Sequence, residues 1–252
     1  MLKSVPSLLA LAALCAATSL FAAPPAQSVK PAAAPAAPAP PAPLVPGGSY
    51  TPKVGDSVET WVMNVRSGKA PEVQAILREN LIPKMMVDDV ISDTYFLAED
   101  GEGNGVLALH FTSTKFAGRA PYQALLEEKL LQLLREPTKR HGYRLVLDLD
   151  EGFVPKAGDK AILFWWQVKK GSLAEAEALV RDQVFAALKG DPFQRRSYLL
   201  EDAAGSALVG VAFLRGEVIM DPKVVEKRKL LGPMLEKPER VATYTLFHFL
   251  DE

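Results

Sequence analysis

Two side-chain amides and one indole have the residue types and spacing that best suit a binding site in this sequence. Asn64 is the lone amide in an apolar stretch, and Gln167 holds the same place in a second apolar stretch 103 residues later. If both stretches are strands, alternation puts Asn64 with Val62 on one face and Gln167 with Trp165 on the corresponding face. A few placed polar groups beside an aromatic ring are typical of ligand pockets. The alternative is that the amides bond each other or a buried water and only satisfy the interior.

The elements that would position these residues come from an internal repeat. One unit is written twice, over residues 50–152 and residues 153–252. The offset between the copies is 103 at their start and 102 in a hairpin, where Leu97 matches Leu199. It is 101 in the last strand, so two single-residue deletions in loops explain the drift.

The other residue types that carry chemistry form no catalytic or metal-binding pattern. His110, His141 and His248 are not at ligand spacing, and the motifs Cys-x-x-Cys and His-Glu-x-x-His are absent. His110 and His248 are expected in strands, where the repeat pairs them with Ala212 and Leu147, which excludes a histidine site shared by both halves. His141 is expected in a solvated loop before a strand. The sequence therefore predicts no metal and no cofactor, and it leaves the catalytic residues unknown.

Each unit is predicted to have the order β-α-β-β-α-β, which is the ferredoxin-like order. The strands are expected at residues 59–66, 94–99, 106–112 and 143–148, and again at 162–169, 197–201, 207–214 and 244–249. The helices are expected at residues 71–86, 121–136, 174–185 and 222–235. Gly232 and Pro233 should interrupt the last helix. Residues 161–166 are apolar on both faces, so the open faces of the two sheets should pack together as a closed barrel.

This element order, the strand-glycine-helix openings around Gly68 and Gly171, and the repeat resemble the dimeric α+β barrel superfamily. That superfamily includes antibiotic-biosynthesis-monooxygenase-like and stress-responsive barrel proteins. The resemblance implies an α+β fold in which two tandem ferredoxin-like (βαββαβ) units form a pseudo-dimeric α+β barrel. Some members degrade haem with an Asn, a Trp and a helical His, but the spacing from Asn64 to Gly68 departs from that motif and no helix here offers a histidine. Cofactor-independent monooxygenases of the family also rely on Asn and Trp near the pocket, which fits Asn64, Trp165 and Gln167.

The N-terminal part is typical of an exported protein. One lysine precedes an apolar core that ends in small residues, so residues 1–22 are expected to be a signal peptide cut after Ala22. Cys15 is not expected to carry a lipid, because Leu14 stands where that motif needs a small residue. Residues 23–49 are rich in Pro and Ala and should form an extended linker. The expected location is periplasmic or secreted, and an uncleaved signal anchored in the inner membrane is the alternative.

The charge of the chain narrows the class of partner. Its formal net charge is −1 over 252 residues without a basic stripe, which argues against a nucleic-acid partner. We expect an exported, non-catalytic protein that binds a small apolar ligand or a protein partner, with Asn64, Trp165 and Gln167 as the ligand-binding residues. No membrane span is expected in the mature chain, whose two units should form a pseudo-dimer. The alternatives are a cofactor-independent monooxygenase- or isomerase-like enzyme acting in the barrel lumen, and a structural module. The sequence leaves open whether the barrel closes within one chain or between two.

Overall fold

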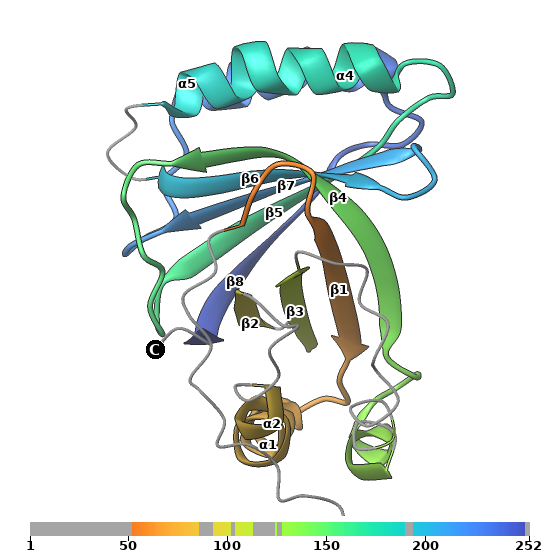
Figure 1. Cartoon of the computed structure of the whole chain (residues 1–252), viewed down its shortest axis with the longest axis vertical. Helices are drawn as coiled ribbons and strands as arrows, with labels where there is room; N and C mark the ends of the chain where they lie inside the picture. The colour runs from red at the N-terminus through yellow and green to blue at the C-terminus, as the bar shows by residue number, and fades with distance from the viewer. Residues whose placement is uncertain are drawn as a thin grey trace, which may run out of the picture. The chain divides into compact units, whose positions relative to one another are not determined.

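Eight strands rich in Val, Leu, Phe and Trp pair into one closed antiparallel barrel (Figure 1). The computed structural model describes residues 52–85, 93–101, 104–112, 124, 128–189 and 194–249. The predicted signal peptide and linker lie outside the described residues. The strands are β1 (Ser57–Asn64), β2 (Thr94–Glu99), β3 (Gly105–Thr112), β4 (Lys139–Asp150), β5 (Lys160–Gln167), β6 (Gln194–Asp202), β7 (Ala207–Leu214) and β8 (Arg240–Phe249).

The barrel closes within one chain. Its strand order is β1-β3-β2-β8-β5-β7-β6-β4, and β4 pairs back onto β1. The first half contributes the sheet β4-β1-β3-β2 and the second half the sheet β8-β5-β7-β6, with seams at β2–β8 and β4–β6. The fold is therefore α+β, and its two ferredoxin-like units form a pseudo-dimeric barrel, as the sequence predicts.

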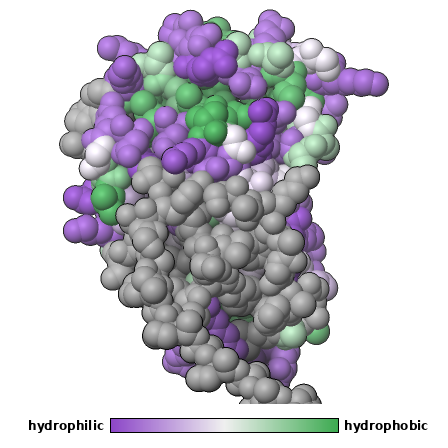
Figure 2. Space-filling view, viewed as in Figure 1, coloured by the Kyte–Doolittle hydropathy of each residue, from purple (hydrophilic) through white to green (hydrophobic). Residues whose placement is uncertain are grey.

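Helical segments cover the outer face of each half. They are α1 (Ala70–Ile76), η1 (Leu77–Leu81), α2 (Ile82–Met85), η2 (Leu131–Leu133), α4 (Leu173–Leu179), η3 (Val180–Phe185), α5 (Ala186–Leu188), α6 (Pro222–Lys229) and η4 (Gly232–Met234). Figure 1 shows α4 and α5 across one side of the barrel and α1 and α2 on the other. Over α4 and α5, hydrophobic side chains gather among hydrophilic ones (Figure 2). Among all the residues that the structure describes, no helix is long and apolar enough to cross a bilayer.

Two predicted helices have different outcomes. The interruption expected at Gly232 is confirmed, because α6 ends at Lys229 and a short 3₁₀ turn, η4, follows. The helix expected over residues 121–136 falls largely outside the described residues, although residues 128–130 are helical and η2 follows them.

Strand pairing corrects one match between the halves. Leu97 pairs with Leu107 on β3, whereas Leu200 pairs with Val209, the equivalent residue of β7. Leu97 and Leu200 both belong to the cluster inside the barrel, but Leu199 packs on the outer side with the helices. A slip of one residue moves a strand side chain to the other face. The predicted match of Leu97 with Leu199 is therefore wrong by one residue, and the offset of 103 persists through β6.

Aromatic side chains fill the middle of the lumen. Four antiparallel pairings separate β1 from β5, so these strands run in the same direction and the axis relating the halves runs along the barrel. Tyr95 and Tyr198 are equivalent residues that meet with their hydroxyl oxygens 3.0 Å apart. Tyr95 packs on Phe213 with ring centroids 4.6 Å apart, and Phe111 packs on Tyr198 at 4.7 Å. All four rings are fully buried, so they occupy the space that a ligand at the centre would need.

Candidate functional site

A cleft of about 840 Å³ opens at the end of the barrel where β1 and β5 end. Asn64 is the last residue of β1 and Gln167 the last residue of β5, and these strands end on the same side because they run in the same direction. Trp165 lines the same cleft from β5. The structure thus brings the three sequence-predicted residues into one cleft, at the mouth of the lumen and not at its centre.

The two amides in this cleft do not bond each other. Asn64 Nδ2 donates to Glu136 Oε1 at 3.4 Å, and Gln167 Nε2 donates to the carbonyl oxygen of Ser206 at 3.2 Å. Both side chains are half-buried. Within the described ranges neither amide oxygen accepts a hydrogen bond, so both are acceptors that a ligand donor could use. The sequence-based alternative of a direct amide–amide bond is wrong.

Two equivalent tyrosines, which the sequence matched at an offset of 101 but did not assign to the site, also line the cleft. Burial raises the pKa of Tyr244 to about 12, nearby Glu99 adds to this, and Arg240 opposes it. Burial also raises the pKa of Tyr143, while a hydrogen bond with Thr60 opposes it. Both phenols therefore keep their protons near neutral pH and present O–H groups that can donate to a ligand.

A cation and an aromatic ring are stacked on the second-half wall. The guanidinium carbon of Arg240 lies 4.7 Å from the centre of the Trp165 ring. Tyr244 approaches the same indole edge-on with ring centroids 6.5 Å apart. Val62 holds the position of Trp165 on the other wall, because Val62 pairs with Lys139 as Trp165 pairs with Arg240. The indole is therefore present on one wall only.

The three carboxylates of the cleft are already engaged. Glu136 Oε2 lies 2.7 Å from Lys139 Nζ. Glu99 Oε2 accepts from the backbone N–H of Gly105 at 3.0 Å. Asp202 Oδ1 accepts from the backbone N–H of Ala207 at 2.9 Å. These contacts give the three carboxylates structural roles at the strand ends.

The histidines occupy two different places. His141 lies in β4 and lines the cleft, so its predicted position in a loop is wrong. His110 is fully buried on the helix-facing side of the first sheet, with Nδ1 3.1 Å from Thr94 Oγ1 and its ring 4.3 Å from that of Trp61. His248 lies on β8, which pairs with β2. The described part of the chain holds no group of three His, Cys, Asp or Glu residues that could bind a metal ion.

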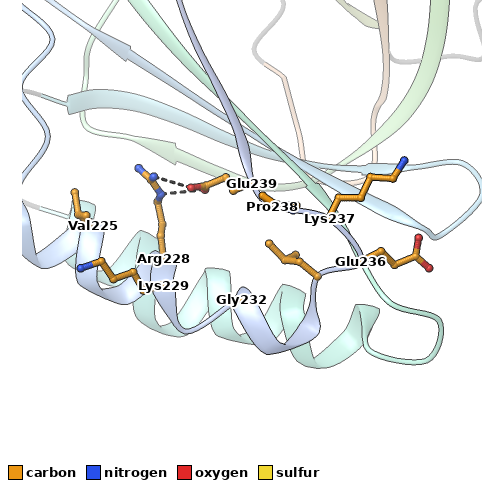
Figure 3. Close-up of a pocket in the computed structure, with 9 residues that line it drawn as sticks. Val225, Arg228, Lys229, Gly232, Glu236, Lys237, Pro238 and Glu239 are labelled. Atoms are coloured by element: carbon orange, nitrogen blue, oxygen red, sulfur yellow. Dashed lines mark hydrogen bonds and ion pairs between the residues drawn. The ribbon is translucent and has the colours of Figure 1, made fainter.

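A second hollow of about 510 Å³ lies beside α6, and Figure 3 shows the residues that line it. Arg228 forms two bonds to Glu239 there, from Nε to Oε1 at 3.1 Å and from Nη2 to Oε2 at 2.7 Å. Trp166 Nε1 also donates to Glu239 Oε1 at 2.6 Å, and Arg228 lies 4.2 Å over the Phe164 ring. These groups tie α6 to the sheet, and Lys237 lines both this hollow and the cleft.

Comparisons with known proteins agree with the fold described here. No protein-family model matches the sequence. None of the curated proteins matches it either. Among solved structures, a protein from Fusobacterium nucleatum assigned as a monooxygenase is similar, with a TM-score of 0.62 at 8% identity, over 78% of this chain and 94% of that chain. The chain has the dimeric α+β barrel fold.

Two further structures share this dimeric α+β barrel fold. An anthrone oxidase-like protein has a TM-score of 0.58 at 9% identity, over 77% of this chain and 92% of that chain. A protein assigned as a chlorite dismutase has a TM-score of 0.52 at 10% identity, over 77% of this chain and 95% of that chain. Similarity at these identities establishes the fold and leaves the activity to the residues of the site.

Proposed function

We propose that the protein binds a small, partly apolar molecule in the cleft at the mouth of the barrel. The observation that carries this proposal is the convergence of Asn64, Trp165 and Gln167 in one cleft. The volume of about 840 Å³ lies within the range of about 300–1,000 Å³ that is usual for ligand sites. Because aromatic rings fill the middle of the lumen, the ligand would enter only as far as the mouth.

The lining of this cleft favours binding over catalysis. It offers a ring face on Trp165, amide oxygens on Asn64 and Gln167, and phenol groups on Tyr143 and Tyr244. Burial raises the pKa values of both phenols above the ordinary value, which already keeps a phenol protonated at neutral pH, so they suit donation better than proton abstraction.

We further propose that this binding takes place outside the cytoplasm. The proposal depends on the sequence of residues 1–22, which is typical of a cleaved signal peptide, and on the Pro- and Ala-rich residues 23–49. Expression of the full chain in a Gram-negative host, followed by mass spectrometry of the purified protein, tests it. A mature N-terminus at Ala23 in the periplasmic fraction is expected, and full-length protein in the cytoplasmic fraction would contradict it.

The cleft can be tested by filling it. Val62→Trp would place a second indole on the wall facing Trp165, while Leu230→Trp adds the same side chain on the exposed surface near the end of α6. We expect the native protein and Leu230→Trp to bind the neutral probe 2-naphthol equally, and Val62→Trp to bind it at least about tenfold more weakly. Isothermal titration measures this, and equal binding by all three proteins would place the site elsewhere.

A second candidate function is a cofactor-independent oxygenase that works in the same cleft. The similarity in fold to an anthrone oxidase-like protein is the observation that favours it. Oxygen uptake with anthrone as the substrate tests this function. Turnover that Trp165→Ala abolishes without unfolding the protein would support the enzyme, whereas binding without oxygen uptake would support the binding protein.

A further inference from the structure

We infer that the cleft selects anionic ligands and holds their charge on one wall, which is formed by Trp165, Lys237 and Arg240. This inference rests on the proposed function, because it names the class of ligand that the same cleft would take. The ligand class is a planar aromatic carboxylate.

The cleft is more cationic than the chain as a whole, whose formal net charge is −1. The charged residues that line it are Arg135, Lys139, Arg140, Lys237, Arg240, Glu99, Glu136 and Asp202. Each carboxylate in this set has a hydrogen-bond or ion-pair partner within the protein. Of the five cations, Lys139 alone pairs with a carboxylate of the described residues. The mouth therefore carries positive charge that a bound anion would neutralise.

The ion pair of the first wall is not repeated on the second wall, because a cation holds the position of its carboxylate there. The backbone N–H of Arg135 donates to Asn64 O at 2.8 Å, and that of Glu236 donates to Gln167 O at 2.9 Å. These matching bonds make Glu136, the next residue on the first wall, equivalent to Lys237 on the second.

On the first wall one cation is neutralised in an ion pair, while Arg135 and Arg140 have no carboxylate partner among the described residues. Glu136 Oε2 lies 2.7 Å from Lys139 Nζ. The pKa of Glu136 is lowered mainly by the hydrogen bond that it accepts from Lys139, and also by the one that it accepts from Asn64. Arg240 holds the position of Lys139 on the second wall, but Lys237 stands where its carboxylate would be. The second wall therefore carries two cations in place of an ion pair.

The carboxylates next to these two cations in the sequence, Glu236 and Glu239, form no ion pair with either of them. Glu239 accepts two bonds from Arg228 and one from the indole N–H of Trp166. Figure 3 shows Glu239 directed toward Arg228, while Lys237 extends away from that pair. Within the part of the chain that the structure describes, Lys237 and Arg240 thus have no carboxylate partner.

The side chains around these two cations indicate a planar carboxylate. A guanidinium group binds a carboxylate through two parallel N–H bonds, and Arg240 is held 4.7 Å over the Trp165 ring. An aromatic ligand could then lie along the indole, with its carboxylate toward Arg240 and Lys237. The ring centroids of Tyr244 and Trp165 are 6.5 Å apart, so the neutral O–H group of Tyr244 adds a hydrogen-bond donor beside the indole.

The test compares two probes of equal shape and different charge. We expect 2-naphthoate to bind the full-length protein at least about tenfold more tightly than 2-naphthamide in isothermal titration. The double variant Lys237→Gln with Arg240→Gln should lose that preference, because its affinity for naphthoate should fall by far more than its affinity for the neutral amide. The matched control is Glu136→Gln with Lys139→Gln, which removes the ion pair of the first wall without changing the net charge and should keep the preference for naphthoate over naphthamide.

Three results would overturn the inference, and they differ in what they say of the cleft. Equal binding of the two probes would overturn anion selection and leave the cleft as a ligand site. Equal loss of naphthoate affinity in the two double variants would overturn the one-sided placement of the charge. Failure of both probes to bind at millimolar concentration would overturn the inference together with the proposed function. A preference for naphthoate that falls in 0.5 M NaCl is the expected result.

Discussion

The two halves of this barrel share a backbone plan but differ in the charges they carry at equivalent positions. At the mouth, Glu136 and Lys139 form an ion pair on the first wall, while Lys237 and Arg240 hold the equivalent positions on the second. The difference shows that matched strands fix where a side chain lies and not what charge it brings. A site built from two similar units can therefore carry its charge unevenly, with an ion pair on one wall and two cations at the equivalent positions of the other.

The far end of the lumen shows the same principle. Tyr95 and Tyr198 are equivalent, but the residue two positions before them is Asp93 in the first half and Arg196 in the second. Arg196 bonds Asp148 Oδ2 at 3.0 Å and Asp150 Oδ2 at 2.6 Å. Among the described residues, the second half therefore holds a buried cation where the first half has Asp93.

The largest predicted effect is the loss of this cation. Arg196→Met should lower the free energy of unfolding by about 4 kcal/mol, because it leaves the mostly buried Asp148 without its cation. Burial already raises the pKa of Asp148 against the opposing effect of Arg196, so the variant should raise it further. Chemical denaturation measures the loss of stability. The control Arg181→Met removes an exposed cation beside Glu177 and should cost less than about 0.5 kcal/mol; equal costs would contradict the prediction.

The next effect concerns the outer faces of the sheets. An added Cβ at Gly210 would lie 2.8 Å from Cη2 of Trp166, whereas Ala108 already carries a Cβ at the equivalent position of the first half. Gly210→Val should therefore cost about 3 kcal/mol through overpacking. Combining it with Trp166→Leu should recover part of that loss in denaturant unfolding. If the double variant is no more stable than Gly210→Val, the close contact with Trp166 is not the cause.

Alkaline pH should separate the two tyrosines of the cleft. The pKa of Tyr244 is about 12 in the folded protein and about 10 when unfolded, so the fold favours the protonated phenol. Its stabilising contribution is complete below pH 10 and is lost as the pH rises through 12. Between pH 10 and pH 12, the free energy of unfolding of the native protein should fall by about 2 kcal/mol more than that of Tyr244→Phe. Unfolding measured at several pH values tests this, with Tyr143→Phe as the matched comparison. A parallel decline in the native protein and Tyr244→Phe would contradict it.

The smallest effect concerns the tyrosine pair on the axis. Tyr95→Phe and Tyr198→Phe should each cost about 1 kcal/mol, because each removes the hydrogen bond between the two buried hydroxyls. The double variant should cost little more than either single one, since both hydroxyls are then absent. Denaturation of the three variants gives the coupling energy, and fully additive losses would show that the hydroxyls do not depend on each other.

Much of the fold follows from the sequence because two copies of each element could be compared. Apolar strands, glycine stops and the hairpin turns predict the order of elements in both units, and the structure agrees wherever it describes these elements. The register of β6 could not be predicted from the sequence. Leu199 and Leu200 are adjacent identical residues, and either of them can be matched with Leu97 by local similarity. Pairing with β7 decides the register, since Leu200 lies opposite Val209.

The candidate site was predicted in part. Alternation placed Asn64, Trp165 and Gln167 on one face, because that inference needs only the period of a strand. Their position at the mouth, and the filling of the lumen by Tyr95 and Tyr198, depend on how the sheets close and could not be derived from spacing. The same holds for the charges of the cleft, since ion pairing depends on contacts that no local pattern predicts.

The closure of the barrel within one chain has a consequence for how a ligand is oriented. In a barrel made of two identical chains, the mouth would be exactly two-fold symmetric, and an asymmetric molecule on the axis would have two poses of equal energy. Here the seams β2–β8 and β4–β6 join different units, so rotation about the axis exchanges Val62 with Trp165. The two poses therefore differ in energy, and one bound orientation is preferred.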